Sequence, residues 1–128
     1  MKELIVSCNL KKFDLISYVQ DHESVFWKQT KTVRRGDRVY IYIGAPHSRL
    51  YYRCDVLDCD LKYSSILMPY YPYYSDQKPT KYMKLGNIKK LPLNGLTLSN
   101  LLANGVKTVQ CSTEVSSVFH DYLSSIIN

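Results

Sequence analysis

The feature that most constrains the fold is a pair of alternating segments on either side of a turn rich in breakers. The first segment, residues 37–44, reads DRVYIYIG, so its aliphatic side chains and its tyrosines point to opposite faces. This period of two is typical of a half-buried β-strand. In the second segment, the residues expected to share one face are Leu50, Tyr52, Cys54 and Val56. Residues 44–49 contain glycine and proline, which interrupt strands, so the sequence predicts a β-hairpin.

The remaining elements are predicted from shorter patterns. Apolar segments indicate strands over Glu3–Asn9, Ser24–Gln29 and Tyr82–Lys90, and helical spacing indicates helices over Phe13–Glu23, Leu96–Asn104 and a C-terminal segment. Thr97 is the expected cap of the second helix, and Ser112 or Thr113 that of the third. The stripe of the third helix expected to face the core comprises Val115, Val118, Phe119, Tyr122, Leu123 and Ile126.

Length and composition indicate one α+β domain over residues 1–128. The chain is 45% hydrophobic and 22% charged, as in ordinary globular proteins. No apolar run approaches the roughly 18 residues of a membrane span, and the N-terminus does not resemble a signal peptide. We therefore expect a cytoplasmic protein with no membrane partner. Three prolines in residues 62–80 exclude a continuous helix there, so this tyrosine-rich segment is expected to wrap the body as a loop.

Positive charge is concentrated in two parts of the sequence. Residues 28–53 carry seven lysines and arginines against one carboxylate, and residues 78–107 carry six lysines and none. The net charge is +6. A basic body of this kind favours a polyanionic partner, most simply nucleic acid, although a basic surface can also be no more than a solvated one.

Patterns of known catalytic chemistry are absent from the sequence. There is no phosphate-binding glycine loop, nucleophile elbow or HExxH motif. The four cysteines include no C-x-x-C pair, so we expect reduced thiols and no metal site or cofactor. Asp55, Asp58 and Asp60 are interpreted as solvating the exit of the hairpin rather than holding a cation. The sequence therefore predicts a binding protein rather than an enzyme.

The order of these motifs resembles the EVE domain. A first strand ending in Ser-Cys-Asn is followed by a helix, the single tryptophan Trp27 and a basic segment running into GDRVYIY. Towards the C-terminus, a lysine-rich strand, a short leucine helix, a G-x-K-x-x-Q step and a closing amphipathic helix continue the match. EVE domains belong with the PUA, YTH and ASCH domains, and the likeness is greatest to modules that accompany nucleases restricting modified DNA. The resemblance implies a small PUA-like β-barrel of five to six strands with flanking helices.

The resemblance also implies a pocket at the mouth of the barrel for a flipped or unpaired base, often a modified one. Carried over by position, the pocket residues would be Trp27 as an aromatic wall, Ser7 and Asn9 as hydrogen-bonding groups, and Tyr42 and Ser48 as floor and lip. The residues expected to contact the nucleic-acid backbone are Arg34, Arg35, Arg38, Arg49, Lys84 and Lys89. The expected partner is nucleic acid, DNA rather than RNA, with a modified cytosine as the candidate base.

Other interpretations remain open at the level of sequence. Trp27 could be an ordinary core residue, as a lone tryptophan in a small domain often is. The chain could instead be a non-enzymatic adaptor that recruits a separate nuclease or toxin through its tyrosine-rich loop. A third alternative is an enzyme acting on RNA or on a small ligand.

Overall fold

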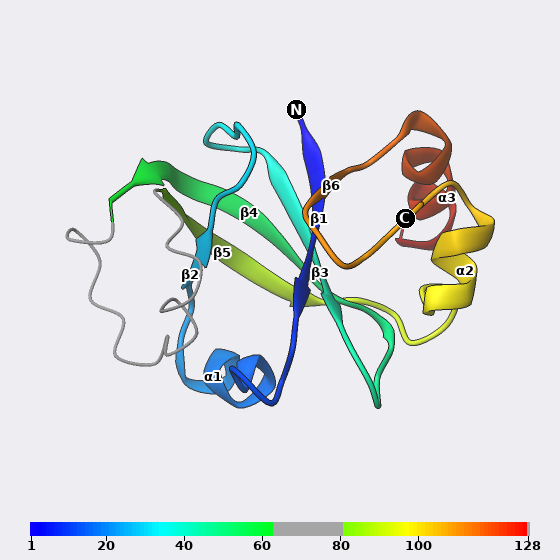
Figure 1. Cartoon of the computed structure of the whole chain (residues 1–128), viewed down its shortest axis with the longest axis horizontal. Helices are drawn as coiled ribbons and strands as arrows, with labels where there is room; N and C mark the ends of the chain where they lie inside the picture. Colours follow the sequence, from blue (N-terminus) through cyan, green and yellow to red (C-terminus); the bar gives the residue numbers. More distant parts are fainter. Residues whose placement is uncertain (63–80, 128) are drawn as a thin grey trace.

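The computed structural model describes residues 1–62 and 81–127, which form a six-stranded sheet flanked by three helices (Figure 1). The strands are β1 (Glu3–Cys8), β2 (Val25–Lys28), β3 (Arg38–Ile43), β4 (Arg49–Leu61), β5 (Tyr82–Lys90) and β6 (Thr113–Glu114). The helices are α1 (Leu15–Asp21), α2 (Leu98–Ala103) and α3 (Ser117–Ile127). The strand order is β2-β5-β4-β3-β1-β6, with β1 parallel to β3 and the other pairs antiparallel. The predicted α+β class, with six strands and flanking helices, is thus confirmed.

The predicted hairpin is formed by β3 and β4, with one irregularity that the alternation did not reveal. Ile41 pairs with Tyr52, whereas the next residue of β3, Tyr42, pairs with Leu50. Tyr51 is therefore an extra residue in β4, a β-bulge. Because a bulge reverses the alternation beyond it, Leu50 does not share a face with Tyr52, and that part of the prediction is wrong.

Two apolar cores lie on the two faces of the sheet. The first is enclosed by the curl of the sheet and closed by α1, and it contains Trp27 together with Phe13 and Leu15. The second lies under α2 and α3, which cover the opposite face (Figure 1). It contains Leu50 and Tyr42. The sheet is therefore buried on both faces, which explains why most positions of β1 and β3 are buried.

The N-termini of the first two helices are capped by side chains. Asp14 caps α1, because its carboxylate accepts a hydrogen bond from the Ser17 backbone N–H at 3.2 Å. Thr97 caps α2 as predicted, within a capping box that Asn100 completes. Gly105 follows this helix with φ +96°, the conformation that favours glycine after a helix.

Helix α3 starts later than its apolar stripe indicates. Its N-cap is Ser116, whose hydroxyl oxygen accepts a hydrogen bond from the Phe119 N–H at 3.2 Å, so neither Ser112 nor Thr113 caps it. Phe119 and Leu123 are buried, whereas Val118 is 62% exposed. The apolar stripe is therefore narrower than predicted.

A buried carboxylate ties α3 to the sheet. Glu3 of β1, 8% exposed, accepts a hydrogen bond from the Tyr40 hydroxyl at 2.7 Å and is paired with the Nδ1 atom of His120 on α3. Burial, together with this bond to Glu3, raises the pKa of Tyr40 to about 12. The contact fixes one end of α3 over the start of β1.

Two further sequence predictions concern the tyrosine-rich loop and membrane spans. The expected wrapping of the tyrosine-rich loop falls on residues 63–80, which lie outside the described residues. In the part of the chain that is described, no helix is both long and apolar enough to cross a membrane.

Candidate functional site

The edge of β1 is only partly covered. Strand β6 pairs with Leu4 and Ile5 alone, and no further β1–β6 pairing occurs in the described chain. The curl of the sheet brings the uncovered part of β1 to face β2 and the residues after it, since both strands line one hollow. We call this gap between β1 and β2, together with the adjoining space at the end of β1, the seam.

The connector that precedes β6 turns away from β1 because its polar groups bond to one another. The Thr113 hydroxyl donates to the carbonyl oxygens of Cys111 at 3.1 Å and Thr108 at 3.4 Å. The Gln110 N–H donates to the Thr108 hydroxyl oxygen at 3.2 Å. This compact turn ends the pairing with β1 and leaves space beside Ser7.

Two hollows occupy that space, and they share Ser7 and Gln110. The first, of about 360 Å³, lies at the end of β1 and is lined by Ser7, Cys8, Asn9, Lys11, Tyr42, Gly44, Ala45, Val109 and Gln110. The second, of about 400 Å³, lies in the seam and is lined by Val6, Ser7, Trp27, Lys28, Thr30, Lys31, Gln110, Cys111 and Ser112. Each falls within the size range of small-ligand pockets.

The charged side chains that line the two hollows are all positive. Lys11 belongs to the first hollow, and Lys28 and Lys31 belong to the second. No carboxylate is among the described residues that line either hollow. The remaining polar groups are hydroxyls, amides, the thiols of Cys8 and Cys111, and the indole N–H of Trp27. The arrangement therefore suits a ligand that combines negative charge with hydrogen-bonding edges.

The structure brings three of the five predicted pocket residues together around the first hollow. Ser7 is the penultimate residue of β1, Asn9 comes directly after the strand, and Tyr42 is the neighbour of Ser7 on β3. The Asn9 side-chain oxygen accepts from the Lys11 N–H at 3.0 Å, and its amide nitrogen has no partner among the described residues. Ser48 lines neither hollow. Its carbonyl oxygen instead accepts from the Leu98 N–H at the start of α2, at 3.0 Å.

Trp27 contributes to the seam hollow from within the core. Its side chain is 2% exposed and packs with Phe13 at a ring-centroid distance of 6.3 Å. An indole this deeply buried forms part of the floor and presents no open face on which a base could stack. The structure thus favours the core interpretation of Trp27, and its predicted role as an aromatic wall would require the side chain to move.

The predicted arginine cluster lies at the opposite end of β1 and β3 from the first hollow. Asp37 fixes the turn before β3, because its carboxylate accepts from the N–H groups of Lys2 at 3.0 Å and Arg34 at 2.8 Å. Arg34 is exposed. Arg35 pairs with Asp58 at 3.3 Å, and Arg38 approaches Asp55 at 3.8 Å. Arg34 is therefore the member of the cluster with no carboxylate partner in the described chain.

Arg49 does not belong to a nucleic-acid surface, so the prediction that it contacts the nucleic-acid backbone is wrong. Its side chain is buried, 5% exposed, and its Nη2 atom donates to the carbonyl oxygens of Leu91 at 2.9 Å and Pro92 at 2.6 Å. Its guanidinium lies 4.9 Å from the centre of the Tyr51 ring. A phosphate cannot reach a group enclosed in this way, so Arg49 is structural.

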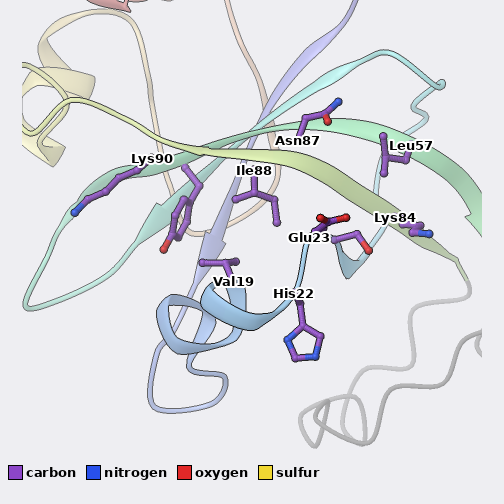
Figure 2. Close-up of a pocket in the computed structure, with 10 residues that line it drawn as sticks. Val19, His22, Glu23, Leu57, Lys84, Asn87, Ile88 and Lys90 are labelled. Atoms are coloured by element: carbon purple, nitrogen blue, oxygen red, sulfur yellow. The ribbon is translucent and has the colours of Figure 1, made fainter.

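The two predicted lysines of β5 lie on another part of the surface. Lys84 lines a third hollow of about 770 Å³ between the C-terminal end of α1 and strands β4 and β5, as does Lys90 (Figure 2). Figure 2 shows Val19, His22 and Glu23 on one side of it and the β5 residues on the other. Lys89 is exposed and lines none of the three hollows. Because Glu23 offsets some of its positive charge, this third hollow is a weaker polyanion site than the seam.

Sequence reasoning missed several residues of the seam. Lys28 and Lys31 were counted in the basic run but not assigned to the pocket, although Lys28 comes directly after Trp27 at the end of β2 and Lys31 lies in the following loop. Gln110 is the final residue of the G-x-K-x-x-Q step. Lys11 had no distinguishing signal. The part of the chain that is described contains no group of three or more histidine, cysteine or acidic side chains placed to hold a metal ion.

Comparison with known proteins gives likeness in structure but not in sequence. No protein-family model matches the chain, and no curated protein matches it. The ASCH protein of Zymomonas mobilis is similar in structure, with a TM-score of 0.71 at 14% identity over 99% of this chain and 96% of that one. A mutant of that protein gives 0.68 at 13% identity over the whole of both chains.

A third similar structure is a protein of Agrobacterium tumefaciens, with a TM-score of 0.68 at 8% identity over 98% of this chain and 92% of that one. These similar structures are ASCH proteins or a protein of unassigned family. They do not test the features particular to EVE domains. At these identities the likeness establishes the fold alone. From end to end, this chain has the fold of the Zymomonas mobilis ASCH protein.

Proposed function

We propose that this protein binds nucleic acid at the seam, with one base in the paired hollows and backbone phosphates on the surrounding lysines. The observation that carries the proposal is the composition of the lining. Three lysines and several hydrogen-bonding groups surround Ser7, without a carboxylate among the described lining residues. The ASCH-type fold also supports the proposal. The EVE domains that the sequence resembles belong with ASCH domains, and the resemblance implies nucleic-acid binding.

The basic groups extend from the seam as a track. Lys28 ends β2, Lys31 lies in the following loop, and Arg34 stands where this loop reaches the turn before β3. Consecutive phosphates of a strand placed along this track would each meet a cation. Such contacts position a nucleic acid without reading its sequence.

The base itself would be read by the hydrogen-bonding groups of the first hollow. The Asn9 amide nitrogen and the Ser7 hydroxyl can bond to a base edge, and Tyr42 forms part of the wall. We propose a modified cytosine in DNA as the preferred target and binding without turnover, with any nuclease supplied by a separate chain. These finer assignments rest on the resemblance to EVE modules.

The first test removes the seam lysines. Lys28→Ala/Lys31→Ala should weaken the binding of a fluorescein-labelled single-stranded oligonucleotide, and the slope of log K against log salt should fall by about 1.4, because each lost phosphate contact contributes about 0.7 for single strands. The measurement is fluorescence anisotropy between about 50 and 200 mM salt, a range over which phosphate contacts change the affinity strongly.

The matched control is Lys12→Ala/Lys107→Ala, which removes the same charge from exposed positions outside both hollows. It should change binding much less. Equal losses in the two double variants would show that binding depends on overall charge, and the seam assignment would fail. If no oligonucleotide binds at all and a protein partner co-purifies, the adaptor alternative takes its place.

A further inference from the structure

The direction of the peptide groups along β1 can be read from its pairing with β3. The Lys2 carbonyl oxygen accepts from the Arg38 N–H at 2.9 Å, and the Cys8 carbonyl oxygen accepts from the Gly44 N–H at 3.2 Å. In a β-strand, the N–H and C=O of one residue point to the same side, and successive residues alternate. The even-numbered residues of β1 therefore bond to β3, and the odd-numbered residues point the other way.

The odd-numbered residues of β1 differ in their hydrogen-bond partners. The Glu3 carbonyl oxygen accepts from the Val115 N–H at 2.8 Å, and Ile5 pairs with Thr113 of β6. Ser7 is the next odd-numbered residue, and by then the connector has turned away. The N–H and C=O of Ser7 therefore point to the junction of the two hollows, which Ser7 itself lines on both sides.

We propose that the backbone N–H and C=O of Ser7 bind the Watson–Crick edge of an unpaired nucleobase. This inference rests on the proposed nucleic-acid binding at the seam and names the part of the base that is read. Each of the four bases carries a donor beside an acceptor on this edge, and proteins that recognise single strands bond to it. A backbone donor and acceptor on one residue provide the complementary pair, and the nearby lysines supply contacts for the flanking phosphates.

The length of the open edge favours a base over a peptide strand. Strand addition needs several consecutive open positions, because a β-strand repeats its bonding direction only every second residue. Here β6 occupies the edge at Glu3 and Ile5. Beyond Ser7, the Asn9 carbonyl oxygen already accepts from the N–H groups of Lys12 and Phe13. One open residue fits a small planar edge and is too short for a strand.

The inference has a consequence for the form of the target. In a duplex, the Watson–Crick edge is occupied by the partner base, so a duplex would bind only after a base has been flipped out. Single-stranded targets should therefore bind more tightly than the same sequence in a duplex. Substituents at C5 of a pyrimidine lie off this edge, so 5-methylcytosine remains able to bind.

The test uses the unaltered protein and oligonucleotides that carry one base in an otherwise abasic backbone. The base is thymine or 3-methylthymine, which is neutral and retains the ring but lacks the N3–H donor. The thymine probe should bind about tenfold more tightly, as expected for the loss of one or two hydrogen bonds. Equal affinity for the two probes, with tight binding of both, would overturn the inference and leave the proposed function standing. Failure of both probes to bind above the fully abasic strand would overturn both.

A pair of variants locates the bond. Ser7→Pro removes the N–H that points to the seam and none of the bonds to β3, and proline is tolerated at such an edge. Ser7→Ala removes only the hydroxyl. The proline variant loses the N–H that donates to a thymine carbonyl oxygen but keeps the C=O that accepts from thymine N3–H, so its affinity for the thymine probe should fall and its preference for thymine should shrink. The alanine variant keeps both backbone groups, so the loss of its hydroxyl should weaken both probes alike and leave the ratio between them unchanged.

Circular dichroism and the melting midpoint establish that each variant is folded. If Ser7→Pro does not fold, the ¹⁵N chemical shift of the Ser7 amide in the unaltered protein replaces it. The thymine probe should move this signal, and 3-methylthymine should move it much less, because its N3-methyl group holds the base edge away from Ser7. A signal that both probes leave unmoved would overturn the assignment to Ser7.

Discussion

At the scale of single residues, the type of a side chain was a poor guide to its exposure. Trp27 and Arg49 were expected at the ligand, yet both are buried, one as core and one as a structural donor to backbone carbonyl oxygens. No local pattern distinguishes Arg49 from the exposed Arg34, because the difference arises from the segment after β5 that folds over Arg49. The roles of Ser7, Asn9 and Tyr42 stay predictions, although the structure brings them to one hollow.

The four cysteines should differ widely in reactivity. Burial raises the pKa of both Cys8 and Cys54 to about 12, whereas Cys111 is exposed in the seam. Because the thiolate is the reactive form, iodoacetamide at pH 8 should alkylate Cys111 first, and Cys8 and Cys54 only after unfolding. Mass spectrometry of digested samples over time measures the order.

The same experiment bears on the seam. A bound oligonucleotide should slow the alkylation of Cys111 and leave that of Cys59 unchanged, since Cys59 lies on β4 and lines neither seam hollow. Equal protection of both thiols would indicate a general effect of the polyanion rather than occupancy of the seam.

At the scale of elements, periodicity predicted the existence of strands and helices well and their relative placement less well. The hairpin, the three other predicted strands and the capped α2 are confirmed, each from residues adjacent in the chain. The bulge at Tyr51 and the late start of α3 depend on tertiary packing, so the local pattern could not show them. The short β6 was missed because two residues carry no periodicity.

The contacts of Arg49 join two elements, and their loss should cost stability. Arg49→Ala would leave the carbonyl oxygens of Leu91 and Pro92 without this donor, where the chain passes from β5 to α2. We expect a loss of about 2–3 kcal/mol in the free energy of unfolding, as for charged hydrogen bonds removed from a buried site. Urea denaturation followed by circular dichroism measures it.

Arg34→Ala is the comparison variant, because Arg34 is exposed and its backbone N–H, not its side chain, bonds to Asp37. Its stability should stay within about 0.5 kcal/mol of the unaltered protein, as for most surface substitutions. If Arg49→Ala were as stable as Arg34→Ala, the structural role of Arg49 would be wrong.

At the scale of the whole molecule, four buried acidic groups should lower the free energy of unfolding at alkaline pH. Burial is the main cause that raises the pKa of Cys8 and Cys54 from 9.0, and of Tyr40 and Tyr52 from 10.0, to about 12. The unfolded chain ionises these groups from pH 9 upward, whereas the folded chain keeps them protonated until about pH 12. Their contribution to stability is thus complete below pH 9 and is lost between pH 9 and 12.

Melting midpoints at intervals between pH 8 and pH 11 should therefore fall steadily. In Cys8→Ala/Cys54→Ala the fall should begin about one pH unit later, because only the tyrosines then ionise on unfolding. A midpoint that stays constant to pH 11 in the unaltered protein would contradict the burial of all four groups.

The open edge of β1 also bears on how the protein behaves at high concentration. An exposed strand edge can pair with the edge of another molecule, which is how many β-proteins begin to aggregate. Here the opening is one residue wide and flanked by Lys28 and Lys31, so two copies that approached edge to edge would bring like charges together. Charge repulsion of this kind weakens as salt screens it. Colloidal stability and the proposed ligand binding would thus depend on the same lysines, and a concentrated stock of the free protein should keep best at low ionic strength.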